Sequence, residues 1–222
     1  MNNKDLIIEE RTNQILEFLK SKKKPEQSIE VLREALKTYK YIVQNINLDV
    51  QENRFESPNS REEAYKNELV KGLTNNTGLP TTNSIALNHL LNSVGIENYI
   101  VILKSRTGGN HVASLIKLDS EYYYFDTTLE KSNYEDQYKG FEDFPLSFAA
   151  LGKEDYERIY KPLRIMASMT KDVTEEIKPD IAEKSISRTL INSISRTIPP
   201  LSEQARNERN REDDDDGEEL VQ

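Results

Sequence analysis

The sequence contains no cysteine, no tryptophan and only two histidines among its 222 residues. The lack of cysteine excludes disulfides, thiolate metal sites and any thiol nucleophile. The two histidines, His89 and His111, follow no His-x-x-x-His spacing and have no carboxylate cluster beside them. A glycine-rich loop that could bind phosphate is also missing. We therefore expect neither a metal site nor a cofactor.

Long apolar runs are missing as well. No stretch approaches the roughly 20 apolar residues that a membrane-spanning helix needs, and residues 1–19 lack the apolar core of a signal peptide. No basic stripe is visible, which argues against a nucleic-acid partner. The sequence therefore predicts a cytoplasmic protein with neither a membrane nor a nucleic-acid partner, and it does not define the oligomeric state.

The composition indicates one domain with appendages. Hydrophobic residues make up 36% of the chain and charged residues 31%, which is too polar for every segment to be buried. We predict an N-terminal helix (1–24), a main domain (25–168), a helical extension (169–200) and a disordered acidic tail (201–222). The tail is almost free of apolar side chains, so it cannot offset the entropy of ordering.

Three helices are predicted in the first 75 residues. Residues 5–20 carry a loose apolar stripe. Residues 27–46 are more clearly amphipathic, because apolar side chains recur at steps of three and four: Ile29, Leu32, Leu36, Tyr39, Val43 and Ile46. A helix at 61–71 is predicted because Ser60 and Glu63 form a capping-box pattern.

Glycine and proline predict where several elements end. Gly72 is expected to close the third helix in a left-handed cap, with turns at 73–78 and an irregular loop at 47–57. Later in the chain we expect a helix at 153–160 that stops before Pro162. One or two amphipathic helices are expected at 173–198.

The stretch 78–128 combines a helix, strands and ionisable residues. A buried helix is predicted at 80–94, with Pro80 at its first position and Gly95 as its stop. Residues 99–103 predict a strand that is covered on both faces. Residues 111–118 and 122–126 predict an antiparallel hairpin.

The register of this hairpin brings a histidine and a carboxylate together. If Leu118 and Glu121 flank a two-residue turn, His111 lies opposite Thr128. Asp126 is then the diagonal neighbour of His111 on the same face of the sheet, and diagonal partners lie within side-chain reach.

Taken in order, these residues resemble the transglutaminase-like superfamily, a branch of the papain-like folds. The resemblance covers roughly residues 39–130. Its motifs are Gly78-Leu79-Pro80, Ser84, Leu90-Leu91, Gly95-Ile96, His111-Val-Ala-Ser and Asp126-Thr127-Thr128. It implies an α+β, papain/transglutaminase-like fold, with N-terminal helices packed on a small antiparallel sheet.

The resemblance also implies a role for each matching residue. In the family a cysteine at the helix start is the acyl-accepting nucleophile, a histidine is the base and an aspartate orients that histidine. Here His111 matches the base and Asp126 the orienting residue, but Pro80 takes the place of the cysteine. The family's Gly-Tyr and Trp-Asn pairs are replaced by Thr82-Asn83 and Ala113-Ser114. These departures favour a lost active site.

Three functional hypotheses follow. The first is a catalytically inactive domain that binds a protein or peptide and keeps His111 and Asp126 as a vestigial pair. The second is an active hydrolase or acyltransferase that uses a hydroxyl of Thr81, Thr82 or Ser84, although such hydroxyls commonly only cap a helix. The third is a purely structural assembly protein.

Overall fold

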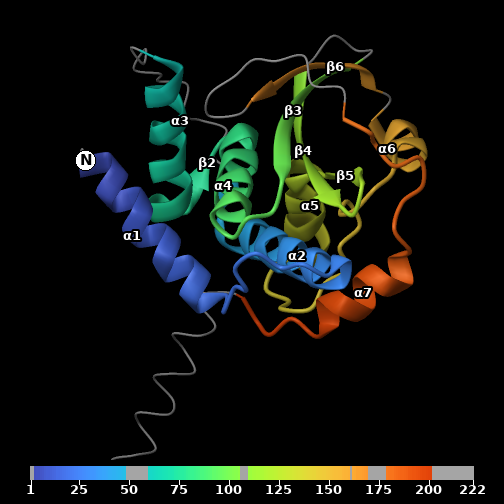
Figure 1. The fold of residues 1–222 in the computed structure, drawn as a ribbon, viewed down its shortest axis with the longest axis horizontal. Coiled ribbons are helices and arrows are strands. Elements are labelled where there is room, and N and C mark those ends of the chain that lie inside the picture. The colour runs from blue at the N-terminus through green and yellow to red at the C-terminus, as the bar shows by residue number, and fades with distance from the viewer. Residues whose placement is uncertain (1–2, 49–59, 106–109, 161, 170–178, 202–222) are drawn as a thin grey trace, which may run out of the picture.

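The computed structural model describes residues 3–48, 60–105, 110–160, 162–169 and 179–201 (Figure 1). The helices are α1 (Asn3–Phe18), α2 (Ser28–Asn45), α3 (Arg61–Val70), α4 (Pro80–Ser93), α5 (Thr127–Asn133), α6 (Lys153–Tyr160) and α7 (Arg188–Arg196). The strands are β1 (Asn47–Leu48), β2 (Thr77–Gly78), β3 (Asn98–Ser105), β4 (Asn110–Leu118), β5 (Glu121–Phe125) and β6 (Pro162–Met169). The α+β class expected from the sequence is confirmed.

An antiparallel sheet with the order β5-β4-β3-β6 lies at the centre of the fold. Because side chains alternate along a strand, its two faces build two cores. Ile100, Ile116 and Phe125 pack into the core that α2 and α4 share. Leu115 and the other side chains on the opposite face of the sheet pack with Tyr156 of α6. Figure 1 shows the same layering, with α4 on one side of the strands and α6 on the other.

The helices of the N-terminal part join the larger core. Ile8, Ile15 and Leu16 of α1 are buried in the same cluster as the apolar faces of α2 and α4. The predicted stripe of α2 is confirmed for its other members but wrong for Ile29, which is 43% exposed. Ile29 lies in the first turn of α2, where no element of the described chain covers it.

The chain after α3 differs from the prediction. The helix does not end in a left-handed cap at Gly72; instead η1 (Lys71–Asn75), a π-helical turn, continues it, and the left-handed residue is Asn76 at φ 52°. The predicted turn at 73–78 therefore contains the last part of η1 and all of β2. Strand β2 pairs in parallel with β1. The predicted loop at 47–57 begins with β1, and the rest of it lies outside the described residues.

The C-terminal part contains a strand that the sequence reasoning missed. Pro162 does end the helical region, but residues 162–169 form β6 against β3. A proline is tolerated there because it begins an edge strand. Of the predicted helices at 173–198, α7 occupies only 188–196, and residues 170–178 lie outside the described part.

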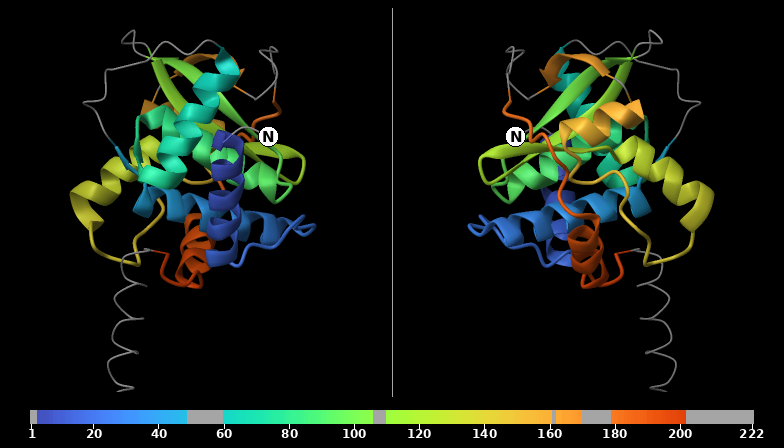
Figure 2. Two further views of the ribbon diagram at one scale, coloured as in Figure 1. Left: turned by 90° about the vertical axis from the view of Figure 1, so that its left-hand side faces the viewer. Right: turned by 90° about the vertical axis from the view of Figure 1, so that its right-hand side faces the viewer.

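Residues 179–201 pack back onto the fold. Ile181 pairs with Tyr122 of β5. Helix α7 lies against α2, as both views of Figure 2 show. The acidic tail predicted from residue 201 onward lies outside the described residues except for Leu201, which is 1% exposed. Within the described ranges no helix combines the length and apolarity that crossing a membrane requires.

Candidate functional site

His111 and Asp126 meet where the hairpin ends. The pairs from Leu118↔Glu121 to Ser114↔Phe125 follow the predicted register around a two-residue turn, and Asp119 in that turn has a positive φ of 58°. Extending the register places Asp126 diagonally from His111. The Nε2 atom of His111 lies 2.5 Å from Oδ2 of Asp126, so their predicted proximity is confirmed. The ladder ends at Phe125, and Thr128 therefore lies in α5 rather than opposite His111.

Asp126 is completely buried and accepts hydrogen bonds from three elements. Besides the His111 ring, the Tyr156 hydroxyl of α6 donates to Oδ2 at 2.7 Å. The Leu129 amide donates to Oδ1 at 2.9 Å, which makes Asp126 the N-cap of α5. A carboxylate only accepts, so Nε2 of His111 carries the proton in this contact.

The first turn of α4 is closely packed. Pro80 is its first residue, a position where the missing N–H costs nothing. The Leu79 amide donates to Oγ1 of Thr82 at 3.0 Å, and this hydroxyl donates to Glu68. A Cβ added at Gly78 would lie 2.5 Å from the Thr82 side chain, so only glycine fits beside it. The prediction that these hydroxyls cap the helix is confirmed for Thr82.

Ser84 connects α4 to the end of the hairpin. Its Oγ lies 3.4 Å from Oγ1 of Thr127, the residue after Asp126. Pro80 precedes Ser84 by one helical turn on the same stripe.

The His111 ring lies at the rim of the sheet. Val112 packs against the α4 side of the sheet and Ala113 belongs to the core on the α6 side. By alternation His111 points to the α6 side, where it shares Asp126 with Tyr156. The His111 side chain is 11% exposed and that of Asp126 is 0% exposed. Of the two, His111 is the one that solvent reaches.

A second carboxylate lies next to this pair. Glu130 of α5 is fully buried, and burial raises its pKa to about 7. The Tyr39 hydroxyl donates to the Asp126 carbonyl oxygen at 2.8 Å and lies 3.2 Å from Oε2 of Glu130. Burial also raises the pKa of Tyr39 well above its usual value, with a smaller contribution from Glu130. Tyr39 is therefore a neutral hydrogen-bond bridge.

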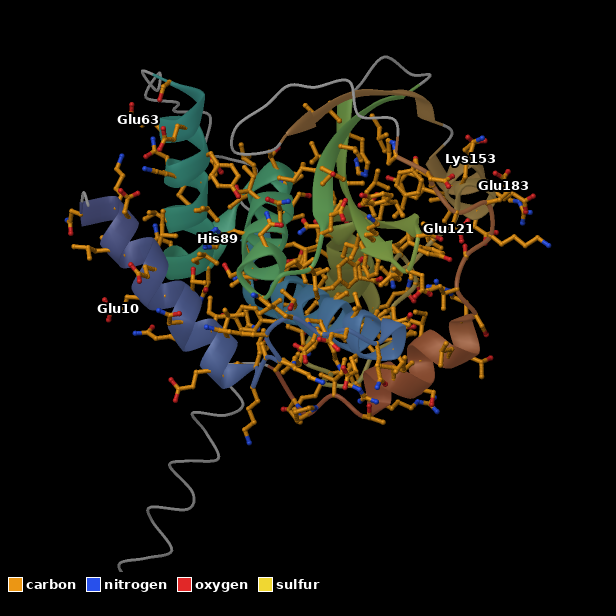
Figure 3. All side chains as sticks on the ribbon, viewed as in Figure 1. Glu10, Glu63, His89, Glu121, Lys153 and Glu183 are labelled. Carbon is orange, nitrogen blue, oxygen red and sulfur yellow. The ribbon has the colours of Figure 1, made fainter. Side chains whose placement is uncertain are left out.

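The other sequence features lie elsewhere. Nε2 of His89 lies 2.8 Å from Oγ1 of Thr12, and Figure 3 shows His89 between α1 and α4, away from the hairpin end. His89 therefore joins α4 to α1. The described part of the chain contains no group of three His, Asp or Glu side chains that could hold a metal ion. A surface hollow lined by Lys4, Glu63 and Lys66 lies between α1 and α3.

The sequence reasoning missed two tyrosines and one glutamate of this network. Tyr39 was predicted only as a member of an apolar stripe, and Tyr156 only as part of a helix. Their hydroxyls reach Asp126 across separations of 87 and 30 residues, which no local pattern encodes. Glu130 did carry a signal, because Asp126-Thr-Thr-Leu is a helix N-cap pattern that predicts α5 and places Glu130 in its first turn.

Comparison with known proteins gives a likeness of fold only. No protein-family model and no curated protein matches the chain. A solved structure described as a proposed cysteine protease from Cytophaga hutchinsonii is 15% identical over 55% of this chain and 37% of its own, with a TM-score of 0.38. A transglutaminase structure is 14% identical over 56% and 31%, also with a TM-score of 0.38.

This chain therefore spans only about a third of the length of either structure. Likeness at this level supports no conclusion about activity.

Proposed function

We propose that this chain is a catalytically inactive domain of transglutaminase-like architecture that binds a protein or peptide beside His111. The proposal rests above all on the first turn of α4, where Pro80 offers no nucleophilic atom and the hydroxyls of Thr82 and Ser84 are engaged in contacts within the fold. A binding role needs only the surface at the end of the hairpin and the first turn of α4.

Two of the three candidate hydroxyls are poorly placed for attack. Thr82 and Ser84 are both 0% exposed. The Thr82 hydroxyl is held by the Leu79 amide and by Glu68, and the Ser84 hydroxyl contacts Thr127. A nucleophile needs its base within about 3 Å and an open path to the substrate. Neither side chain offers that path.

Thr81 is the hydroxyl that keeps the second hypothesis open. Its side chain is half-buried, whereas Thr82 and Ser84 are enclosed. An acyl-transfer reaction at Thr81 would require His111 as general base, with Asp126 holding the imidazole. The third hypothesis, a structural assembly protein, is favoured by the burial of Asp126 and its three hydrogen bonds.

Two activity assays test the proposal against catalysis. The purified full chain is incubated with fluorescein-labelled casein to detect hydrolysis, and with casein plus a fluorescent primary amine to detect amide transfer. We expect neither reaction. Turnover that Thr81→Ala and His111→Ala each abolish, while Thr74→Ala retains it, would establish the enzyme and refute the proposal.

A selection experiment tests binding directly. A library of displayed 12-residue peptides is selected on the full chain, and enriched peptides are measured by calorimetry. We expect peptides whose affinity falls at least tenfold in His111→Ala and stays unchanged in His89→Ala, the matched control on α4. Equal binding by both variants, or no enrichment on folded protein, would contradict a binding site beside His111.

A further inference from the structure

Glu130 holds two backbone amides of a neighbouring segment. Its Oε1 accepts from the Ser147 amide at 3.1 Å and its Oε2 from the Phe148 amide at 2.7 Å. Oε2 also lies 3.2 Å from the Tyr39 hydroxyl. The two amides donate to Glu130, the Tyr39 hydroxyl shares its one proton with the Asp126 carbonyl oxygen, and the Glu130 side chain is 0% exposed. A buried carboxylate thus fixes the N–H groups of a segment that has no regular secondary structure.

Arg188 holds the same segment through its carbonyl groups. Its guanidinium donates to the Leu146 oxygen at 2.9 Å and the Ala150 oxygen at 3.3 Å, and it also bonds the Ala149 oxygen. We call residues 146–150 the strap. The strap is therefore held by an acid from α5 and by a base from α7, and neither group belongs to the sheet.

The strap lies directly against the candidate site. The Asp126 amide donates to the Phe148 oxygen at 3.0 Å. The Tyr39 hydroxyl joins the Asp126 carbonyl oxygen to Glu130. If the strap leaves, Asp126 loses a backbone partner and Glu130 loses its two amide donors. The strap and the His111–Asp126 pair are therefore mechanically connected.

We propose that Glu130 is a proton-sensitive clamp, which keeps the strap closed against Asp126 when protonated and releases it when it ionises. The clamp regulates the binding site proposed above, and in this respect the inference rests on the proposed function. The closure of the strap can be measured whether or not that site binds a ligand.

The direction follows from burial and from the surrounding charges. The groups that face Glu130 are Tyr39 from α2, Asp126 at the N-cap of α5 and Arg188 from α7, and Asp155 of α6 acts in turn on Arg188. Tyr39 stays neutral. Arg188 favours the ionised carboxylate, and so do the amides of the strap. Desolvation opposes them and is the largest effect, so the pKa of Glu130 is raised from 4.5 to about 7.

A raised pKa in the closed state makes closure depend on pH. In an open state Glu130 reaches water and returns towards its ordinary pKa, so the closed state binds the proton more tightly. Closure is then favoured fully below the open-state pKa and is weakened as the pH rises towards about 7. The rise in the pKa of Glu130 from 4.5 to about 7 sets an upper limit of between about two and three orders of magnitude on the change in the open population.

Amide hydrogen exchange on the full chain tests the clamp. Exchange of the Ser147 and Phe148 amides is measured from pH 5 to pH 8 and corrected for intrinsic exchange rates. We expect the corrected exchange to accelerate at least tenfold over this range. Glu130→Gln should remove the acceleration, because its amide cannot ionise. Glu154→Gln, an exposed carboxylate on α6, should behave as the wild type.

Three results would overturn the proposal. The first is the same pH dependence in wild type and Glu130→Gln. The second is a parallel acceleration of amides in α2 and β4, which would indicate global unfolding. The third applies even if Glu130→Gln does not fold: a carboxyl NMR titration of wild-type Glu130 with a midpoint below pH 5. None of these outcomes depends on peptide binding, so the clamp and the proposed function can fail separately.

Discussion

Placing a thiol at Pro80 tests whether the start of α4 faces His111. The chain contains no cysteine, so Pro80→Cys introduces a single reactive thiol. Proline at this position stabilises the fold mainly by restricting the unfolded chain. Its loss therefore lowers the free energy of unfolding by at most about 1 kcal/mol. The substitution adds a backbone N–H in the first turn of α4, where N–H groups have no intrahelical partner in any helix. The variant should therefore fold, and its thiol should report on its surroundings.

The expected alkylation rate of the new thiol follows from two opposing effects, the fraction of thiolate and the nucleophilicity of that thiolate. A free thiol with a pKa of about 8.5 is roughly 0.3% thiolate at pH 6, whereas a pKa of about 6.5 gives about 24%. A helix N-terminus beside an imidazolium lowers a thiol pKa by at least this much. Intrinsic nucleophilicity falls with pKa, which removes a factor of about eight. The net expectation is alkylation about tenfold faster than that of an ordinary thiol.

Iodoacetamide labelling at pH 6, followed by intact mass, measures this rate. The matched control is Ser93→Cys, an exposed position at the other end of the same helix. Adding His111→Ala to Pro80→Cys should slow alkylation several-fold and leave a smaller contribution from the helix terminus. If Pro80→Cys and Ser93→Cys react at equal rates, then Pro80 does not occupy the position facing the base, and the resemblance fails at its most important residue.

Urea unfolding tests three further contacts. Tyr156→Phe removes a donor from buried Asp126 and should lower the free energy of unfolding by about 1–2 kcal/mol; no loss would mean that water replaces the hydroxyl. Gly78→Ala places a methyl group against the Thr82 side chain and should cost about 1–3 kcal/mol, and a neutral result would show that the first turn of α4 can shift. Arg188→Ala leaves several carbonyls without their donor and should cost about 2–3 kcal/mol, against less than about 0.5 kcal/mol for exposed Arg196→Ala.

The hairpin was predictable because its determinants are local. The two residues between Leu118 and Glu121 set the register, and the register fixes every pair as far as Phe125. The proximity of His111 and Asp126 follows from the same spacing. The start of α4 was predictable for a related reason, since Pro80 is compatible with the first position of a helix and not with its interior.

The elements that the sequence reasoning missed depend on distant partners. Strand β6 pairs with β3 across about 60 residues, and Pro162 indicated only that a helix ends there. Gly72 fits a helix cap, but the backbone continues through η1, where the space beside Gly72 is filled by the Thr82 side chain at 3.0 Å. A close approach by another element calls for glycine as strongly as a left-handed turn does. The identity of the residue does not separate these causes.

In the proposed architecture Pro80 stands at the nucleophile position, and a physical asymmetry explains how a proline there is compatible with the presence of His111 and Asp126. A side chain at the first position of α4 makes none of the hydrogen bonds that close the helix, so its replacement leaves no buried group unpaired. Asp126 accepts from His111, Tyr156 and Leu129 and thereby joins β4, α6 and α5. Removing it would leave buried donors without partners, each at a cost of about 1–3 kcal/mol. Stability alone is therefore enough to account for the presence of the pair. Any binding function must act through the exposed edge of the His111 ring and not through Asp126.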